Sequence, residues 1–171
     1  HRSRVLNRLQ PETFRKVREE IEEFARNAIG LYALALPPEK LVELGHNAWL
    51  TGQKLFDERE VRHDNLFRAI KSFSEAEALV DSVEPKPDYY AKAVAAREEC
   101  KRLQQTKYED FMFRADRSIK LSDWKEANAY LQVLIETLGD RSDERYDAVN
   151  KKLIDVQRRL EAYEFENAYG Y

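Results

Sequence analysis

The stretch DYYAKAVAAREECKRLQQTKYEDFMFRADRSIKLSDWKEANAYLQVLIETL, residues 88–138, contains neither glycine nor proline. A β-rich fold needs turn-forming residues about every 8–12 positions, so this stretch favours helices. The whole chain of 171 residues has only five glycines and five prolines, and none of the glycines has the spacing of a phosphate-binding loop. The sequence therefore predicts an all-α fold.

Two helices are predicted within this stretch. Apolar residues keep roughly one helical phase over 88–121 and nothing obviously breaks the pattern, so one long helix is favoured over two. Asp123, with Glu126 three residues later, is typical of the capping box at a helix start, and a tight turn is expected at Ser122-Asp123. Gly139 is expected to close this second helix as a C-terminal glycine.

Outside this stretch, prolines mark the remaining boundaries. Pro37-Pro38 separates two expected helices, and Pro85-x-Pro87 stops a third that reaches Val80. The polar segment 57–64 is either a loop or the frayed end of a helix. The expected organisation is a single helical domain over residues 1–171, with an N-terminal helix at 11–36, helix pairs over 38–138, a C-terminal capping helix at 142–165 and a tail at 166–171.

The two terminal helices carry regular apolar stripes, in which residues recur at steps of three and four. The stripe of the first comprises Phe14, Val17, Ile21, Phe24, Ala28 and Leu31. That of the last comprises Tyr146, Val149, Leu153, Val156, Leu160 and Tyr163. Such regularity fits packing against a neighbouring helix. The tyrosine-rich tail is expected either to fray, to fold back, or to dock on another copy.

Two helix pairs carry a pattern of small and large residues. Ala69-x3-Phe73-x2-Ala76 has small residues around a phenylalanine, and Gly52 is a small residue where two helices can cross closely. The second pair has Phe111, Ala115, Trp124, Ala127, Leu131 and Leu134 at equivalent positions. This pattern resembles the tetratricopeptide repeat, a helix–turn–helix unit of about 34 residues, over roughly 44–138.

The resemblance has three departures from the family's pattern. Ala69 and Ala127 are 58 positions apart, which is neither one nor two repeat lengths. About five extra residues lie between Gly52 and Ala69, and Leu134 replaces the last small residue. The resemblance therefore implies a divergent α-solenoid, an antiparallel array of about five to six helices with one long central helix.

In that family, the first helix of each pair lines a groove that binds extended peptides or partner helices. The residues that the resemblance places on such a groove are His46, Trp49, Gln53 and Phe56 in the earlier unit, and Glu109, Met112, Asp116, Ile119 and Lys120 in the later unit. An exposed Trp49 is a natural binding hot spot. The alternative is that Trp49 and Phe56 pack against the first helix.

The sequence contains few residues of the types that form catalytic or metal sites. Three histidines and one cysteine occur without any zinc-binding spacing. His63 next to Asp64 suits a solvated loop better than a catalytic base. Cys100 has basic neighbours that can lower a thiol pKa, but a small residue on a packed helix face is the preferred interpretation. We therefore expect no enzyme activity and no metal or cofactor.

The expected function is a non-catalytic protein–protein interaction domain, a scaffold or adaptor that binds a protein or peptide partner in a helical groove. The alternative is a homo-oligomerisation module that packs through its terminal helices. A helical enzyme or metal protein is a weaker third hypothesis.

Charge and hydropathy limit the kinds of partner and the cellular location that are expected for the chain. With 29 basic and 32 acidic residues interspersed, a nucleic-acid surface is not expected. The longest apolar run, 28–36, is shorter than the roughly 20 residues that span a bilayer. A cytoplasmic location is expected for this segment, which starts at His1 and can belong to a larger, membrane-anchored protein.

Overall fold

The computed structural model describes residues 16–17, 19–21, 23–24, 27–28 and 35–170. These residues form helices and connecting turns without any strand, which confirms the all-α class. The helices over 35–170 are α3 (Pro38–Asp57), α4 (Asn65–Leu79), α5 (Tyr90–Lys120), α6 (Trp124–Leu138) and α7 (Glu144–Tyr169). Of the expected N-terminal helix, the described residues between 16 and 28 are helical. Pro11, Phe14 and Leu31 lie outside the described residues.

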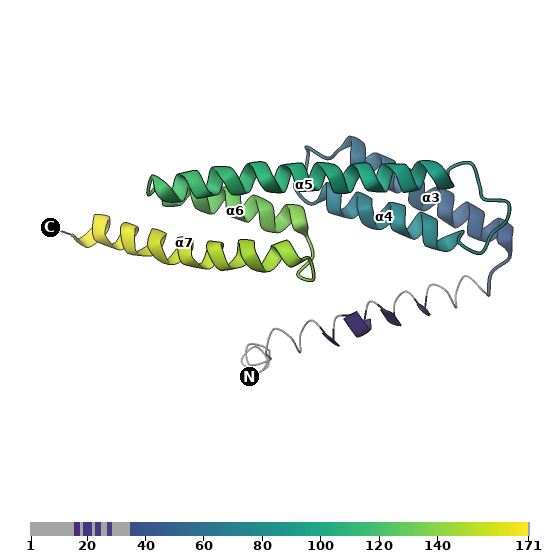
Figure 1. Cartoon of the computed structure of the whole chain (residues 1–171), viewed down its shortest axis with the longest axis horizontal. Helices are drawn as coiled ribbons and strands as arrows, with labels where there is room; N and C mark the ends of the chain where they lie inside the picture. Colours follow the sequence, from purple (N-terminus) through teal and green to yellow (C-terminus); the bar gives the residue numbers. More distant parts are fainter. Residues whose placement is uncertain (1–15, 18, 22, 25–26, 29–34, 171) are drawn as a thin grey trace.

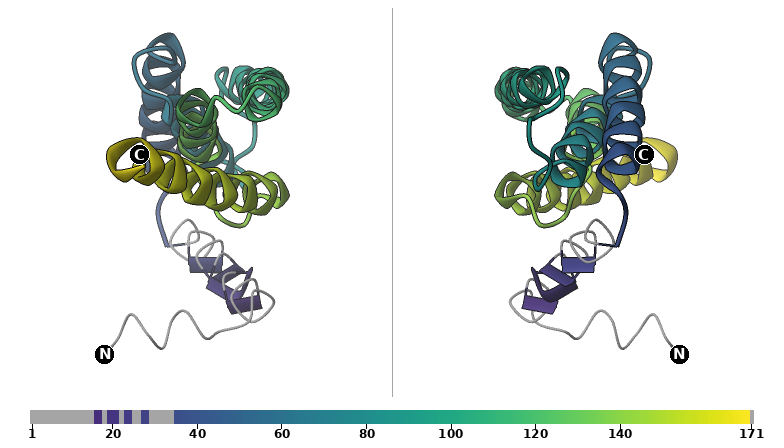
Figure 2. Two further views of the ribbon diagram at one scale, coloured as in Figure 1. Left: turned by 90° about the vertical axis from the view of Figure 1, so that its left-hand side faces the viewer. Right: turned by 90° about the vertical axis from the view of Figure 1, so that its right-hand side faces the viewer.

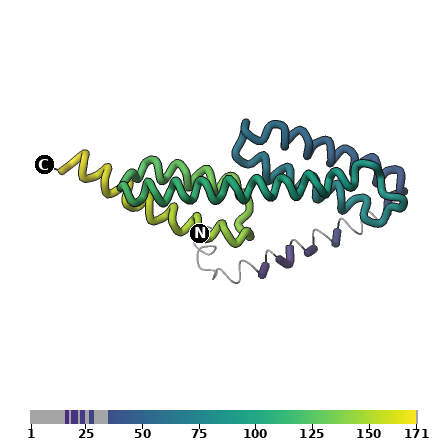
Figure 3. Tube along the Cα trace, turned by 45° about the horizontal axis from the view of Figure 1, so that its top comes forward, coloured from purple at the N-terminus to yellow at the C-terminus, as the bar shows by residue number. Residues whose placement is uncertain are grey.

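Helix α5 is a single helix of 31 residues, which confirms the preference for one helix over two. At a rise of 1.5 Å per residue it spans roughly 46 Å. Figures 1 and 3 show α3 and α4 beside its N-terminal half, and α6 and α7 beside its C-terminal half. The end-on views of Figure 2 show α3 and α7 inclined in different directions, so the array twists between its ends.

The apolar core of the described residues divides into three clusters, two in the half that contains α3 and α4 and one in the half that contains α6 and α7. One half buries Leu66, Ala69, Phe73, Ala93 and Cys100, from α4 and the first turns of α5. The other half buries Ala115, Ala127, Leu131, Leu134, Leu138, Val149, Leu153 and Val156. The apolar stripe of the last helix is therefore used inside the chain.

Gly52 is where α3 and α4 cross, as the sequence predicts. A Cβ atom placed on Gly52 would lie 2.6 and 2.7 Å from two ring carbons of Phe73, closer than real contacts allow. Phe73 is fully buried, and so are Ala69 and Ala76 on either side of it. The missing Cβ of Gly52 lets the phenylalanine ring fill the space between the two helices.

The turn between α5 and α6 forms at Ser122-Asp123, where Ser122 adopts a positive φ of 58°. The Asp123 carboxylate accepts a hydrogen bond from the Glu126 backbone N–H at 3.0 Å, which confirms the N-cap. The return bond of a capping box is absent, because the Glu126 carboxylate instead accepts from the Ser118 hydroxyl at 2.7 Å. Gly139 ends α6 in the left-handed conformation, as expected.

Segment 57–64 is mainly a loop, since α3 ends at Asp57 and α4 begins at Asn65. The buried Asn65 side chain donates a hydrogen bond to the Glu58 carbonyl at 2.8 Å and holds this loop closed.

Two predicted boundaries of the last helix are wrong. It begins after Asp143, whose carboxylate accepts from the Arg145 backbone N–H at 2.9 Å, so the cap is Asp143 instead of Ser142. It also continues to Tyr169, so 166–169 is helix instead of tail, because no helix breaker precedes Gly170. Tyr171 lies outside the described residues. No helix in the described part of the chain is long and apolar enough to cross a membrane.

Candidate partner-binding surface

Trp49 stacks within an aromatic cluster, so it is not free as an exposed hot spot. Its ring lies 6.0 Å from that of Tyr89, nearly parallel at 20°, and 5.6 Å from that of His46. The Tyr89 hydroxyl donates to the Val42 carbonyl at 2.8 Å, which joins the start of α5 to α3. Trp49 is only half-buried, but its indole nitrogen is buried and has no hydrogen-bond partner among the described residues.

The other predicted residues of α3 surround this cluster. His46 and Gln53 are exposed, and Phe56 is half-buried beneath the Arg59 guanidinium, 4.7 Å from its ring centre. This side of α3 thus presents mainly polar groups to solvent.

The predicted residues of α5 lie in its C-terminal half, and one of them contacts α7. The Asp116 carboxylate forms a 2.7 Å ion pair with Lys152 of α7. Met112 and Ile119 pack against the core of that half, and Glu109 accepts from Gln105 at 2.7 Å. Lys120 is exposed in the last turn of α5.

The structure does not bring the predicted binding residues of α3 and those of α5 together. The α3 set lies beside the N-terminal half of α5, and the α5 set lies in its C-terminal half (Figure 1). Met112 and Asp116 of the α5 set also contact the chain itself, so part of that set is occupied by internal packing. The two sets therefore do not line one continuous groove.

A different surface, at the C-terminal end of the array, carries exposed apolar side chains. Leu121 follows α5 with 68% exposure, and Tyr163, Phe165 and Tyr169 of α7 are 49%, 66% and 71% exposed. Phe165 and Tyr169 lie on the outer face of α7 with ring centres 5.0 Å apart, and we call these two residues the terminal apolar surface. A separate hollow of ≈ 370 Å³ lies on the inner face of α7, between Leu121, Trp124 and Lys125 on one side and Leu160 and Tyr163 on the other. The sequence drew attention to Tyr163, Phe165 and Tyr169, but Leu121 gave no signal because its exposure depends on the turn geometry.

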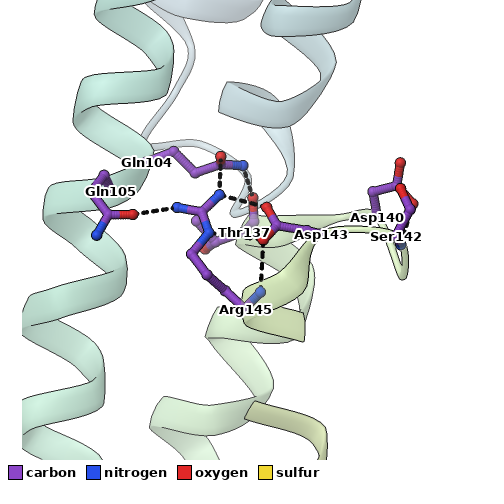
Figure 4. A network of polar contacts seen from close by, with 7 residues as sticks. All are labelled: Gln104, Gln105, Thr137, Asp140, Ser142, Asp143 and Arg145. Carbon is purple, nitrogen blue, oxygen red and sulfur yellow. Dashed lines mark hydrogen bonds and ion pairs between the residues drawn. The ribbon is translucent and has the colours of Figure 1, made fainter. Parts of the chain in front are cut away.

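A polar junction joins the middle of α5 to the start of α7 (Figure 4). The Arg145 guanidinium donates to Gln104 at 2.9 Å, to Gln105 at 2.7 Å and to Asp143 at 2.9 Å. Gln104 is itself buried and donates to the Thr137 carbonyl at 2.8 Å. Burial by itself would raise the pKa of Asp143, but hydrogen bonds from Arg145 outweigh it and hold that pKa below its ordinary value. The junction ties the end of α6 and the start of α7 to the middle of α5.

The sequence indicated this junction only by an interruption in the apolar pattern of the long helix. Gln104 interrupts the apolar stripe of the long helix, and it is buried because its amide binds a carbonyl of α6. Its partner Arg145 is forty-one positions away, so no local pattern connects them.

Cys100 lies on a packed helix face, as the preferred interpretation had it. Its side chain is fully buried, and burial, with Glu99 nearby, raises the pKa of the thiol to about 11. The basic neighbours considered from the sequence are turned to other partners, since Arg97 pairs with Glu77 at 2.7 Å and Lys101 with Glu98 at 3.3 Å. Among the residues that the structure describes, no three metal-binding side chains form a cluster.

The thiol of Cys100 is therefore expected to resist modification in the folded protein. Its reaction with dithionitrobenzoate should be at least ~100-fold slower in native conditions than in urea, because both burial and a low thiolate fraction oppose attack. Stopped-flow or bench absorbance measurements give both rates, with the urea sample as the control. Equal rates in the two conditions would contradict the buried position.

Comparison with protein families, with curated proteins and with solved structures gives no match. The tetratricopeptide resemblance therefore stays a prediction from the residues that carry it.

Proposed function

We propose that this chain is a non-catalytic protein–protein interaction module, a divergent tetratricopeptide-like α-solenoid that binds a peptide or partner helix. The helix-crossing pattern at Gly52 and Phe73 supports the repeat-like architecture, as does the packing of each helix from α4 to α7 on the one before it. Among the described residues, no helix covers the outer face of α7, where Phe165 and Tyr169 are exposed.

The observation that carries this proposal is the terminal apolar surface. Soluble proteins bury most large apolar side chains, and an exposed group of them marks a contact site more often than scattered single residues do. Phe165 and Tyr169 are aromatic residues whose rings lie 5.0 Å apart, and aromatic side chains dominate binding hot spots.

Self-association is the second candidate, and the same surface supports it. The stripe of α7 that the sequence proposed for oligomerisation includes Val149, Leu153 and Val156, which are at most 9% exposed within the chain. Leu153→Asp would therefore unfold the protein instead of separating two copies. Within α7, the outer end that carries Phe165 and Tyr169 remains exposed for a contact between copies.

The test compares a double variant of the terminal apolar surface, Phe165→Ser with Tyr169→Ser, against Leu50→Ser, an exposed apolar residue of α3. Partners are captured from the source cell by cross-linking and mass spectrometry, then rebuilt from purified components. Affinity for the purified partner should fall at least ~10-fold in the double variant and stay unchanged in the control, since each hot-spot aromatic contributes more than about 1 kcal/mol.

Equal affinity of the double variant and the wild type would reject this surface. Sedimentation velocity on a dilution series distinguishes self-association, the second candidate, from binding of a foreign partner. A dimer that dissociates with the double variant, but not with Leu50→Ser, would favour self-association over a foreign partner.

A further inference from the structure

The N-terminal helical residues carry an apolar face that the described chain leaves in solvent. Val17, Ile21 and Phe24 are 48%, 62% and 74% exposed, and they lie at the three- and four-residue steps of one helix face. Ala28 continues the same face one turn later. Three large apolar side chains on one face gain free energy when a matching surface covers them. We call Val17, Ile21, Phe24 and Ala28 the N-terminal apolar face.

A groove of ≈ 540 Å³ between α3 and α4 offers such a surface. Its walls comprise Leu44, Asn47, Ala48 and Thr51 of α3, and Ser72, Glu75 and Leu79 of α4. Ala28 also lines this groove, so one residue of the N-terminal apolar face already lies against it. This groove lies on the side of α3 opposite to Trp49 and Gln53, because Thr51 and Gln53 differ by 200° around the helix.

We propose that the N-terminal apolar face docks into the groove between α3 and α4 and caps this end of the array. With Ala28 beside Leu44 and the helix antiparallel to α3, Ile21 comes opposite Thr51, because both lie seven residues further along helices of equal rise. Phe24 then lies near Ala48, where the groove is apolar. The chain between residue 28 and Pro38 is short, so the effective concentration of the face at the groove is high.

The charges at the far end of the groove favour the same occupant. Glu20 lies beside Ile21 on the flank of the N-terminal apolar face. Lys54 of α3 and Arg68 of α4 are exposed one turn beyond Thr51 and Ser72 of the lining, so in the docked register Glu20 approaches the basic residue on its own flank. An acidic residue of the docked helix therefore meets a basic end of the groove, while Glu75 lines the groove nearer its middle.

Paired cysteines test the docking in the full chain. Ile21→Cys combined with Thr51→Cys should form an intrachain disulfide under mild oxidation, because a disulfide needs Cα atoms within about 7 Å. The matched control combines Ile21→Cys with Gln53→Cys, which places the second thiol on the opposite shoulder of α3. We expect the Thr51 pair to react at least ~10-fold faster than the Gln53 pair. Native Cys100 is buried with a pKa of about 11 and does not compete.

Non-reducing gels and peptide mapping distinguish the outcomes. Adding Phe24→Asp to the Thr51 pair should reduce its rate to that of the Gln53 pair, with the helical circular dichroism signal unchanged. Equal rates for the two original pairs overturn the proposal, and so does a faster Gln53 pair, which would place the face against Trp49. A disulfide formed mainly between two chains would also overturn it, in favour of a second copy in the groove.

Discussion

Phe73→Ala is expected to lower the free energy of unfolding by about 4 kcal/mol, because fully buried phenylalanines lose about 3–5 kcal/mol when truncated to alanine. The Phe73 ring is completely buried, and it packs against Gly52 where α3 and α4 cross. Urea denaturation followed by circular dichroism measures the change. A loss below about 1 kcal/mol would show that the crossing does not depend on this ring.

The packing of Phe73 on Gly52 predicts a reversal of sign in a double-mutant cycle. Gly52→Ala alone should destabilise the protein, since its Cβ would lie 2.6 Å from a Phe73 ring carbon. In the Phe73→Ala background the same change should stabilise by up to ~1 kcal/mol, because alanine is the better helix former once the ring is gone. An effect of the same sign in both backgrounds would contradict this contact.

Arg145→Ala is expected to lower the free energy of unfolding by about 2 kcal/mol at neutral pH, because charge-assisted hydrogen bonds to partly buried groups contribute about 1.5–3 kcal/mol. The change removes the donors that hold Asp143, Gln104 and Gln105 at the junction between α5 and α7. Arg102→Ala is the matched control. Its 2.7 Å pair with Glu99 is equally short but exposed, so a loss below about 0.5 kcal/mol is expected.

The pH dependence of stability provides a second readout for the junction. The pKa of Asp143 is lowered below its ordinary value of 3.8, so the folded protein prefers the ionised carboxylate. This contribution is fully present above the ordinary pKa and is lost as the pH falls through the lowered one. The wild type should therefore lose more stability than Arg145→Ala between about pH 5 and pH 2. Parallel profiles for the two proteins would show that Arg145 does not set this pKa.

Much of the helical layout could be predicted because its signals are local. The capping carboxylate of Asp123, the left-handed Gly139 and the unbroken helix over α5 each depend on residues within one or two turns. The crossing at Gly52 was also predictable, since a glycine inside a helical pattern and a buried Ala-x3-Phe-x2-Ala face are complementary. The end of α7 was misjudged because the loss of an apolar stripe indicates loss of packing, not loss of helix.

The candidate site was less predictable because it depends on distances between helices. His46 and Gln53 do stay exposed on α3, as a surface role requires. Trp49, however, is stacked on Tyr89, a residue forty positions away, and Asp116 is paired with Lys152 across α5 and α7. Neither partner could be chosen from helical periodicity, which shows which face a residue occupies but not what lies opposite.

The sequence by itself determined that this chain is helical, where most of its helices begin and end, and where α3 and α4 cross. These properties follow from backbone preferences, caps and small-residue notches, all of which act over a few residues. Only the tertiary structure decided that the apolar core divides into separate clusters along the long helix α5, that the predicted groove residues lie in different halves, and that Phe165 and Tyr169 stay exposed at the end of α7. The physical reason is that the inclination of one helix against the next is set by side chains that interlock from distant parts of the chain.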